Sequence, residues 1–472
     1  MKRQTYLDFI SELLPEQDFL NFQKFYKERV KKSIKIIYSR IEKKSILEYL
    51  KGNNWNIIEP DLTTNKKPIN DVLFIEKEDK QTLWANFLHQ TWFYYVQEMA
   101  AGASAQMLPL EKNDLILDLC AAPWWKTVQL ADKLLNLWRW NVIANEPSNQ
   151  RRKVLIYNLN RCWMYNTWVT GYDGTFLWDM LPEEFDKVLV DAPCSWEWMQ
   201  YKNDKTVNFR DEKSAEKLSK LQFQLLESWL KALKINWTIV YSTCTLNPLE
   251  NEWVISRILE KYNDEVILEN VEIDQKSIGI KEYKWKELLS EENMQKVARF
   301  WPHIQHTGGF FIAKIKKIKS IPYGKTVDKR IEKKWILDTS ADLQNRVRKY
   351  LNENRWIEKL EGFKFIASDQ AVYVTSENFE IPKVFIEKIW IPIIKISFSK
   401  ERIPQQWLAT IFWSYAKFNT VTLTDKELQI IIDKYQIEKK VEKKNIPFII
   451  WKRLEKGCIM LKQTWDILKW KL

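Results

Sequence analysis

Two cysteines, each following an apolar stretch, are the residues best suited to covalent chemistry. Cys194 lies in "DAPCS" and Cys244 in "STCTLNP". A thiolate is a strong nucleophile that can be activated without a histidine, and the chain has only three histidines. If the preceding stretches form adjacent parallel strands, both thiols lie on one rim of the sheet. The pair favours nucleophilic catalysis, whereas either cysteine alone would be read as a buried structural thiol.

Four carboxylates stand at successive strand ends: Asp118, Glu146, Asp173 and Asp191. In open α/β sheets, ligands bind outside the carboxyl ends of the strands, and an acid after the second strand commonly holds ribose hydroxyls. A single acid at such a position would be read as a solvated turn residue. Four in succession favour a ligand site on the rim that carries the cysteines.

An alternation of apolar strands and helices places these residues. Near-continuous apolar strands separated by helices indicate a parallel sheet that is buried on both faces. We expect "GGFFIAKIKK" (308–317) to be a later strand at an edge, and a helix at about 94–109. The expected strands are 114–119, 141–145, 168–173, 187–192 and 238–243, and the helices are 126–136, 148–162 and 214–234.

The flanking segments read as separate units. Residues 1–85 alternate strand and helix and are expected to form a small α/β module. After a basic linker at 318–326, short strands such as "GFKFIA" and "AVYVTS" and a helix at 404–417 indicate a mostly β accessory region over 327–472. Residues 86–317 remain as the central domain.

The charge balance suits a polyanionic partner. Lys and Arg number 74 against 62 for Asp and Glu, a net charge of +12. The basic stretches 29–44 and 314–334 carry interleaved Ile and Tyr, a pattern that fits nucleic acid. Charge alone leaves open the alternative that these are merely solvated lysine faces.

Composition also argues against several classes of protein. No apolar run of about 18 residues predicts a membrane span. Five scattered cysteines form neither an even disulfide set nor a zinc-ligand pattern, so no metal site is expected. The chain is expected to act in the reducing cytoplasm, as a monomer.

Five segments, in order, resemble the motifs of the Sun family of RNA (cytosine-5) methyltransferases, and most closely its RsmF type. They are "LDLCAAPWWKT", "NVIANEPSNQRRKVLIYNLNR", "DAPCSWEWM", "YSTCTLNPLENE" and "FWPHIQHTGGFFIAK". The resemblance runs from about 29 to 317, and the paired "PCS" and "TCT" cysteines are its most specific part. The tail resembles, more weakly, an RNA-binding extension with a PUA-like module.

The resemblance implies a Rossmann-like class I methyltransferase domain over 86–317, an N-terminal RNA-binding module over 1–85, and S-adenosylmethionine as cofactor. Glu146 would hold the ribose hydroxyls, Asp173 would meet the adenine, and Asp191 would sit between the cofactor and the base. The turn that wraps the cofactor's methionine and ribose would comprise Cys120, Ala121, Ala122, Pro123, Trp124, Trp125 and Lys126.

By the same resemblance, Cys244 is the nucleophile and Cys194 assists breakdown of the covalent adduct. C5 of cytosine is a poor nucleophile, but addition of a thiolate to C6 makes it an enamine carbon that can take a methyl group. Asp191 can bond to or protonate the ring near N3 and so offset the developing charge. The target base must be unstacked to reach such a pocket.

Tryptophan stands where the family carries glycine, at 124, 125, 196 and 198 and usually at 84, 92 and 237. The chain has 10 Gly and 25 Trp, and together they match the roughly 33 glycines usual for this length. Trp124 and Trp125 fall in a strand-to-helix turn that often needs positive φ, where glycine is the default residue. Some genetic codes read UGA as glycine and others as tryptophan, so translation with the second table explains the exchange.

Two functions are therefore expected in order of preference. The first is methylation of cytosine C5 in RNA, with ribosomal RNA the preferred substrate and transfer RNA left open as the alternative. The alternative is a catalytically inactive RNA-binding or ribosome-assembly factor on the same scaffold, with genuine tryptophans. Retention of Cys194, Cys244 and all four acids favours the enzyme.

Overall fold

The structure is a computed structural model. The residues that it describes are 6–26, 32–58, 63–64, 67–68, 72–77, 83, 87–90, 92–111, 114–137, 141–176, 181–195, 212–284, 286–322, 339–355, 360–368, 371–377, 388–389, 391–396, 402–404, 420–434, 436–439, 448–451, 457–464 and 467–470.

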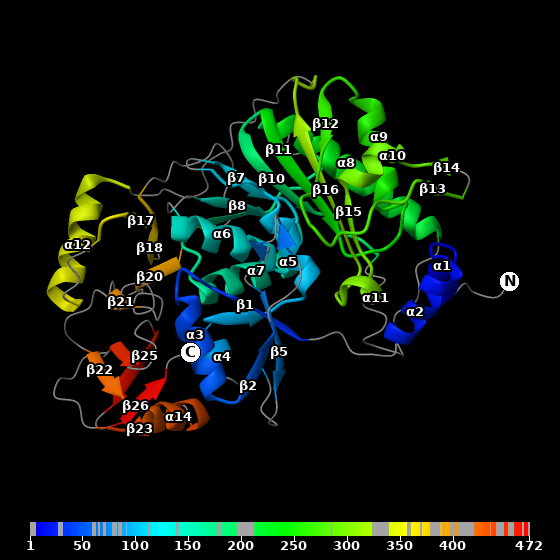
Figure 1. Cartoon of the computed structure of the whole chain (residues 1–472). Helices are drawn as coiled ribbons and strands as arrows, with labels where there is room; N and C mark the ends of the chain where they lie inside the picture. Colours follow the sequence, from blue (N-terminus) through cyan, green and yellow to red (C-terminus); the bar gives the residue numbers. More distant parts are fainter. Residues whose placement is uncertain are drawn as a thin grey trace.

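A large, mostly parallel sheet forms the centre of the molecule (Figure 1). Its strands follow the order β12-β16-β11-β10-β7-β8-β9-β19. The five strands predicted as parallel pair in parallel, and the chain order reverses between β7 and β10. They are β7 (Ile116–Asp118), β8 (Val142–Asn145), β9 (Thr167–Thr170), β10 (Phe185–Asp191) and β11 (Leu233–Thr243). This is the expected Rossmann-like arrangement, with its ligand edge at the carboxyl ends of β7 and β10.

The expected edge strand is not an edge. β16 (Phe310–Lys317) lies between β11 and β12 (Val266–Glu269), antiparallel to both, and β15 (Ala298–Phe300) also pairs with it. Its burial explains the position, because six of its eight residues are buried. The sequence showed one apolar strand and could not show that two shorter segments would cover it.

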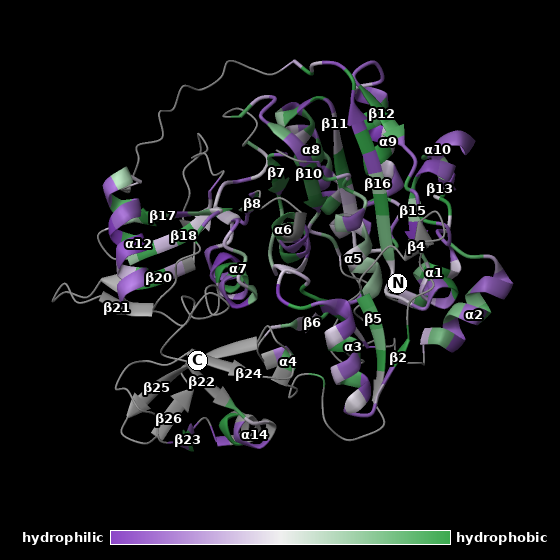
Figure 2. Ribbon diagram, turned by 60° about the vertical axis from the view of Figure 1, so that its left-hand side comes forward, coloured by the Kyte–Doolittle hydropathy of each residue, from purple (hydrophilic) through white to green (hydrophobic). Residues whose placement is uncertain are grey.

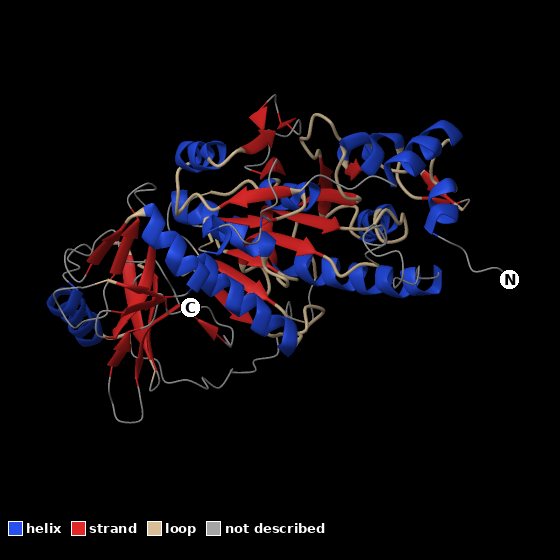
Figure 3. Cartoon of the chain, turned by 90° about the horizontal axis from the view of Figure 1, so that it is seen from below, coloured by secondary structure: helices blue, strands red, loops and turns tan. Residues whose placement is uncertain are grey.

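Helices cover both faces of this sheet, as the view from below shows (Figure 3). On one face pack α5 (Met99–Gln106), α6 (Trp125–Leu137) and α7 (Asn149–Cys162). On the other pack α8 (Glu212–Ala232) and α9 (Glu252–Lys261), with Trp229 fully buried against the strands. The strands between the helices are predominantly apolar (Figure 2), as burial on both faces requires.

The N-terminal module is larger than predicted. Its sheet has the order β2-β5-β1-β6, built from β1 (Ser33–Ile36), β2 (Trp55–Ile58), β5 (Val72–Lys77) and β6 (Tyr94–Val96). Because β6 pairs with β1, the boundary expected at 85 lies after Val96. The helix expected at 94–109 is correspondingly shorter, since its first three residues form β6.

The remaining short elements frame these two units. The helices α1 and α2 pack beside α11 and the apolar residues Leu246 and Trp301. The elements are α1 (Tyr6–Ser11), α2 (Glu16–Tyr26), α3 (Lys43–Gly52), β3 (Thr63–Thr64), β4 (Lys67–Pro68), α4 (Phe87–Gln90), β13 (Glu282–Tyr283), β14 (Lys286–Glu287), α10 (Glu291–Lys296) and α11 (Pro302–Gln305).

The C-terminal region contains two further sheets, as the short strands predicted. The first has the order β17-β18-β20-β21 and is covered by α12 (Ala341–Arg355) (Figure 1). The second has the order β22-β24-β25-β26-β23, and α14 (Asp425–Lys434) contacts its strands β22 and β23. The helix expected at 404–417 lies outside the described residues. The strands are β17 (Phe363–Ala367), β18 (Ala371–Ser376), β20 (Ile391–Ile396), β21 (Arg402–Pro404), β22 (Thr420–Leu423), β23 (Gln436–Glu438), β24 (Phe448–Trp451), β25 (Gly457–Thr464) and β26 (Ile467–Trp470).

This region also completes the central sheet. The two-residue strand β19 (Lys388–Ile389) pairs antiparallel with β9. Beside it, the hydroxyl of Ser376 donates to Asn141 at 3.0 Å, and Trp163 and Tyr165 pack into the apolar core around α12. The accessory region is therefore joined to the central domain by backbone pairing as well as by side-chain packing.

Tryptophan occupies left-handed backbone positions at two helix ends. Trp163 (φ 65°) follows α7, where its N–H donates to the carbonyls of Leu159 and Asn160. Trp92 (φ 61°) lies just after α4, and its N–H donates to the carbonyl of His89. Glycine is the usual residue at such an end, because a Cβ is strained there. Trp92 confirms a position where glycine was predicted, and Trp163 adds one that the sequence did not single out.

We predict that Trp163→Gly is more stable than Trp163→Ala by about 1 kcal/mol, because only alanine bears the left-handed strain. Both variants lose the same indole contacts, so their difference isolates the backbone term. The free energies of unfolding in urea measure it.

Trp253 provides the matched control, because it lies in the first turn of α9 and has no positive φ. Its alanine variant should be more stable than its glycine variant, by up to the helix-propensity difference of about 1 kcal/mol. The same order of stability at both positions would contradict the strain argument.

Candidate active site

The two cysteines meet at the carboxyl end of the sheet. β10 and β11 run in parallel with Asp191 opposite Ser242, so the residues that follow each strand leave the sheet side by side. The Sγ atoms of Cys194 and Cys244 lie 3.1 Å apart. Cys194 is 7% exposed, and Cys244 is the more accessible of the two. The predicted juxtaposition is present in the structure, with the candidate nucleophile on the open side.

Asp191 ends β10, three residues before Cys194, and is held by two neighbours. Its Oδ1 accepts from the hydroxyl of Ser242 at 3.0 Å, and its Oδ2 forms an ion pair with Lys126 at 2.5 Å. Lys126 enters from the first turn of α6, which follows the predicted cofactor turn. The sequence placed Lys126 among cofactor contacts, whereas in the structure its ammonium group neutralises the central carboxylate.

Asp118 is a buried carboxylate at the end of β7. Its Oδ2 accepts from the Thr127 hydroxyl at 2.6 Å, while its Oδ1 is buried without a hydrogen-bond partner among the described residues. The pKa of Asp118 is raised to about 7, chiefly by burial; the hydrogen bond from Thr127 lowers it and the nearby Asp191 carboxylate raises it. Burial likewise raises the pKa of the Cys120 thiol well above its ordinary range. This part of the rim therefore disfavours the charged forms of both groups unless a cation lies beside them.

The two remaining acids differ in their surroundings. Glu146, at the end of β8, is 2% exposed, accepts from the N–H of Ser148 at 2.8 Å and lies 3.5 Å from the guanidinium of Arg151. Asp173 is exposed and accepts from both the N–H and the hydroxyl of Thr175. Both stand on the predicted rim, but only Glu146 is enclosed.

Trp124 adopts a backbone conformation that belongs to glycine. Its φ is 134°, a value that strains any residue with a Cβ. Its indole is 8% exposed and packs against Tyr95 and Trp92, with ring centroids 4.9 and 5.3 Å away. The prediction of a strained turn is confirmed at 124. Trp125 begins α6, and Trp84, Trp196 and Trp198 lie outside the described residues.

Sequence reasoning missed several polar side chains that hold this rim. Asn145 donates to the carbonyls of Leu119 and Tyr172 and accepts from the N–H of Tyr172, so it ties the ends of β7, β8 and β9 together. An asparagine inside an otherwise apolar strand was a readable signal. Gln222 and Glu250, both fully buried near the cysteines, were not readable, because their partners are distant in sequence.

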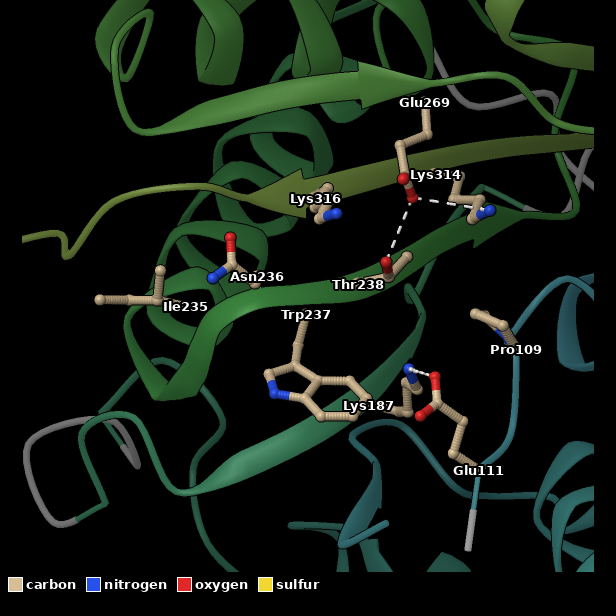
Figure 4. A pocket seen from close by; sticks show the side chains of 10 residues that line it. All are labelled: Pro109, Glu111, Lys187, Ile235, Asn236, Trp237, Thr238, Glu269, Lys314 and Lys316. Atoms are coloured by element: carbon tan, nitrogen blue, oxygen red, sulfur yellow. Dashed lines mark hydrogen bonds and ion pairs between the residues drawn. The ribbon is translucent and has the colours of Figure 1, made fainter.

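A hollow of about 420 Å³ lies at the opposite end of β10 and β11 (Figure 4). Three lysines line it, Lys187, Lys314 and Lys316. Two of them are paired: Nζ of Lys187 lies 3.6 Å from the carboxylate of Glu111, and Nζ of Lys314 lies 3.5 Å from that of Glu269. The indole of Trp237, a predicted glycine position, lies over Lys187 at 3.8 Å. Because its charges are largely paired internally and it is remote from the thiols, this hollow is not the candidate active site.

Comparison with known sequences finds relatives of the central segment. Residues 105–316 match the family described as 16S rRNA methyltransferase RsmB/F. This segment of the chain is similar to that family. The ribosomal RNA small subunit methyltransferase F of Erwinia tasmaniensis is 32% identical over 330 residues, which is 67% of this chain and 64% of the relative. That of Vibrio parahaemolyticus is 28% identical over 431 residues, 90% of this chain and 86% of the relative.

The extent of these matches varies. The chain covers 64% and 59% of the length of the relatives from Erwinia tasmaniensis and Vibrio cholerae, less than two thirds in each case. Among solved structures, a methyltransferase homologue from Pyrococcus horikoshii has a TM-score of 0.55 at 22% identity, covering 66% of this chain and 94% of its own. NSun6 from the same organism gives 0.53 at 22%, covering 66% and 97%. These structural likenesses establish the fold.

Two features are absent from the described residues. No group of three or more His, Cys, Asp or Glu side chains is arranged to hold a metal ion. No helix in the described part is both long enough and apolar enough to cross a membrane.

We predict that Asp118→Asn stabilises the protein above neutral pH. The pKa of Asp118 is raised in the folded state, so folding takes up a proton between about pH 4 and 7, and stability falls as pH rises through that window. Urea unfolding at pH values from 4 to 8 should show that the free energy of unfolding of the variant, relative to wild type, increases as the pH rises through this range.

The control is Asp114→Asn, away from the cysteines. Burial raises the pKa of Asp114 to about 6, so the stability that this variant gains over wild type should stop increasing near that pH. A difference between Asp118→Asn and wild type that does not change with pH would contradict the assignment.

Proposed function

We propose that this protein methylates C5 of cytosine in ribosomal RNA, using S-adenosylmethionine and a transient covalent bond between Cys244 and C6 of the base. The observation that carries the proposal is the thiol pair, 3.1 Å apart, after the strand that ends in Asp191, in a segment that is similar to the RsmB/F family. The names of the relatives supply small-subunit ribosomal RNA as the substrate class.

The carboxylates of the rim fit this cofactor. S-adenosylmethionine carries a sulfonium and an ammonium group, and the unpartnered Oδ1 of Asp118 lies in a region where Asp191 and Glu146 add negative potential. A cation is the ligand that such a site stabilises. Glu146 would hold the ribose hydroxyls and Asp173 the adenine. When bound, the cofactor supplies the methyl group that C5 receives.

The chain's own residues supply the remaining chemistry. The Cys244 thiolate adds to C6. Asp191, after taking a proton from solvent, donates a hydrogen bond or that proton to N3 of the ring and so stabilises the charge that develops there. Lys126, paired with Asp191, keeps that carboxylate close to the base. After methylation, Cys194 removes the proton from C5, the C5–C6 double bond re-forms, and Cys244 leaves as a thiolate.

RNA would be held by the exposed cations and not by every residue of the basic stretches. Lys35, Arg40 and Lys317 are 3%, 3% and 0% exposed, and Arg40 and Lys317 donate to the carbonyls of Trp92 and Leu233. Burial removes these three from the predicted phosphate contacts. Residues 29–31 and 323–334 of the same stretches lie outside the described residues.

The outer units complete the proposal as RNA-binding parts. We assign that role to the N-terminal module and to the C-terminal region over 327–472, the latter as a PUA-like extension, in a cytoplasmic monomer. The runner-up is a catalytically inactive RNA-binding or ribosome-assembly factor. The strained Trp124 favours that reading if the tryptophans are genuine, whereas the aligned thiols and enclosed carboxylates support the enzyme.

We further propose that Trp124, Trp92 and Trp163 are glycines in the natural protein, encoded by UGA. Among the described residues, eight non-glycine positions have positive φ and three of them are tryptophan, a residue with no preference for that region. Trp55 and Trp301 are buried with ordinary backbones, as expected of genuine tryptophans.

Cys194→Ala should trap a protein–RNA adduct that survives a denaturing gel, because Cys244 can still add to C6 but the adduct cannot break down. Cys244→Ala should form no adduct and no methylcytosine. The assay uses small-subunit ribosomal RNA and S-adenosylmethionine. Methylation by Cys244→Ala would overturn the assignment of the nucleophile.

The protein with Trp124 and Trp125 should bind S-adenosylmethionine weakly or not at all, because backbone strain of about 1–3 kcal/mol accompanies Trp124 and both indoles add bulk to the turn that must wrap the cofactor. Restoring glycine at 124, 125, 196 and 198 should recover binding and methyl transfer. Calorimetric titration of both proteins with the cofactor measures the difference.

The codons at these positions provide an independent check. Equal, tight binding by the tryptophan-containing protein would rule out the proposal that these positions need glycine.

A further inference from the structure

The backbone around Cys194 is held from both sides by one pair of buried side chains. The Nε2 of Gln222 donates to the carbonyl of Pro193 at 2.9 Å, and the N–H of Ser195 donates to Oε2 of Glu250 at 3.0 Å. Gln222 and Glu250 are themselves joined by a 2.9 Å hydrogen bond. The residues before and after Cys194 are thus fixed to a single unit, which we call the release clamp.

The release clamp spans two elements and contains a buried charge. Gln222 comes from α8 and Glu250 from the turn before α9, and both are 0% exposed. The carbonyl of Glu250 also accepts from the hydroxyl of Tyr241 at 2.6 Å. Burying a carboxylate is unfavourable unless several donors satisfy it, and two apolar side chains would pack here without that penalty. The hydrogen bonds of the buried Gln222–Glu250 pair do, however, fix the position of the loop.

A second, separate set of residues holds the loop of Cys244. The carbonyl of Leu246 accepts from Nη1 of Arg299 at 3.0 Å. Arg299 in turn forms a two-point ion pair with Glu252, with both side chains fully buried. We call Arg299 and Glu252 the attack clamp. A 3.1 Å hydrogen bond between the hydroxyls of Ser195 and Thr245 joins the two loops.

We propose that Gln222 and Glu250 are positioning residues for Cys194, and that they control release of the product and not attack on the base. The proposal rests on the function proposed above. Release needs the Cys194 thiolate at the C5 proton; it accepts that proton, the C–H electron pair forms the C5–C6 double bond, and the bond from Cys244 to C6 breaks with departure of the thiolate. Attack needs only Cys244, whose loop the attack clamp holds.

Loss of each clamp should affect a different step, either formation or release of the adduct. Loosening the release clamp displaces Cys194 while Cys244 stays in place, so adducts form at a near-normal rate and accumulate. Loosening the attack clamp displaces Cys244, so adducts form slowly. A displacement of about 1 Å in a reacting group can lower a rate by up to about a hundredfold, which makes the two steps separable.

The test is single-turnover kinetics with small-subunit ribosomal RNA and S-adenosylmethionine, in which adduct on denaturing gels and 5-methylcytosine are followed together. Glu250→Ala and Gln222→Met should slow release at least about tenfold and raise the adduct level, with the rate of adduct formation close to wild type. Glu250→Gln keeps the acceptor oxygen for Ser195 and Gln222 and should restore release. Arg299→Lys should slow formation instead.

The matched control is Gln129→Met, a buried glutamine of α6 that bonds to Gln97 away from the cysteines; it should leave both rates unchanged. Gln222→Met keeps the side-chain volume and decides the matter if Glu250→Ala does not fold. Slower formation with unchanged release in Gln222→Met would overturn the inference, as would adduct accumulation in the control. If Cys194→Ala itself trapped no adduct, the proposed function would fail and not this assignment alone.

Discussion

The parallel pairing of β10 with β11 is the constraint on which the site depends. With Asp191 opposite Ser242, the two chains leave the sheet at one level, and a shift of the register by one residue would reverse which face each side chain occupies. Two thiols can approach to 3.1 Å only because two strands distant in sequence end together. The helices cover both faces of that pairing, and the antiparallel strand β16 covers the outer edge of β11.

Charge is arranged around this pairing in a graded way. Asp118 lies deepest and has its pKa raised by burial, Asp191 is neutralised by Lys126, and Asp173 stands in the open. A cation beside Asp118 would favour the ionised form of that carboxyl, whereas Asp191 already has a cationic partner in Lys126.

The sequence predicted the parts of the fold that repeat a local pattern. The five parallel strands and the cysteine pair followed from apolar runs that end in polar residues, and the strain at Trp124 followed from the needs of a tight turn. The inner position of β16, the extension of the N-terminal sheet to Val96 and the burial of Lys35 and Arg40 depend on contacts between distant segments. The hydrogen bonds of Gln222 and Glu250 to the Cys194 loop were hidden for the same reason.

The pairing of β19 with β9 has a consequence for how the protein is made. During synthesis the sheet lacks its last strand until Ile389 has left the ribosome. Until then β9 presents an open edge, which is a template for pairing with other chains. The accessory region thus covers the edge of β9 once it has been synthesised. A chain that stops before residue 388 would keep the paired cysteines but would expose this edge and be prone to aggregate.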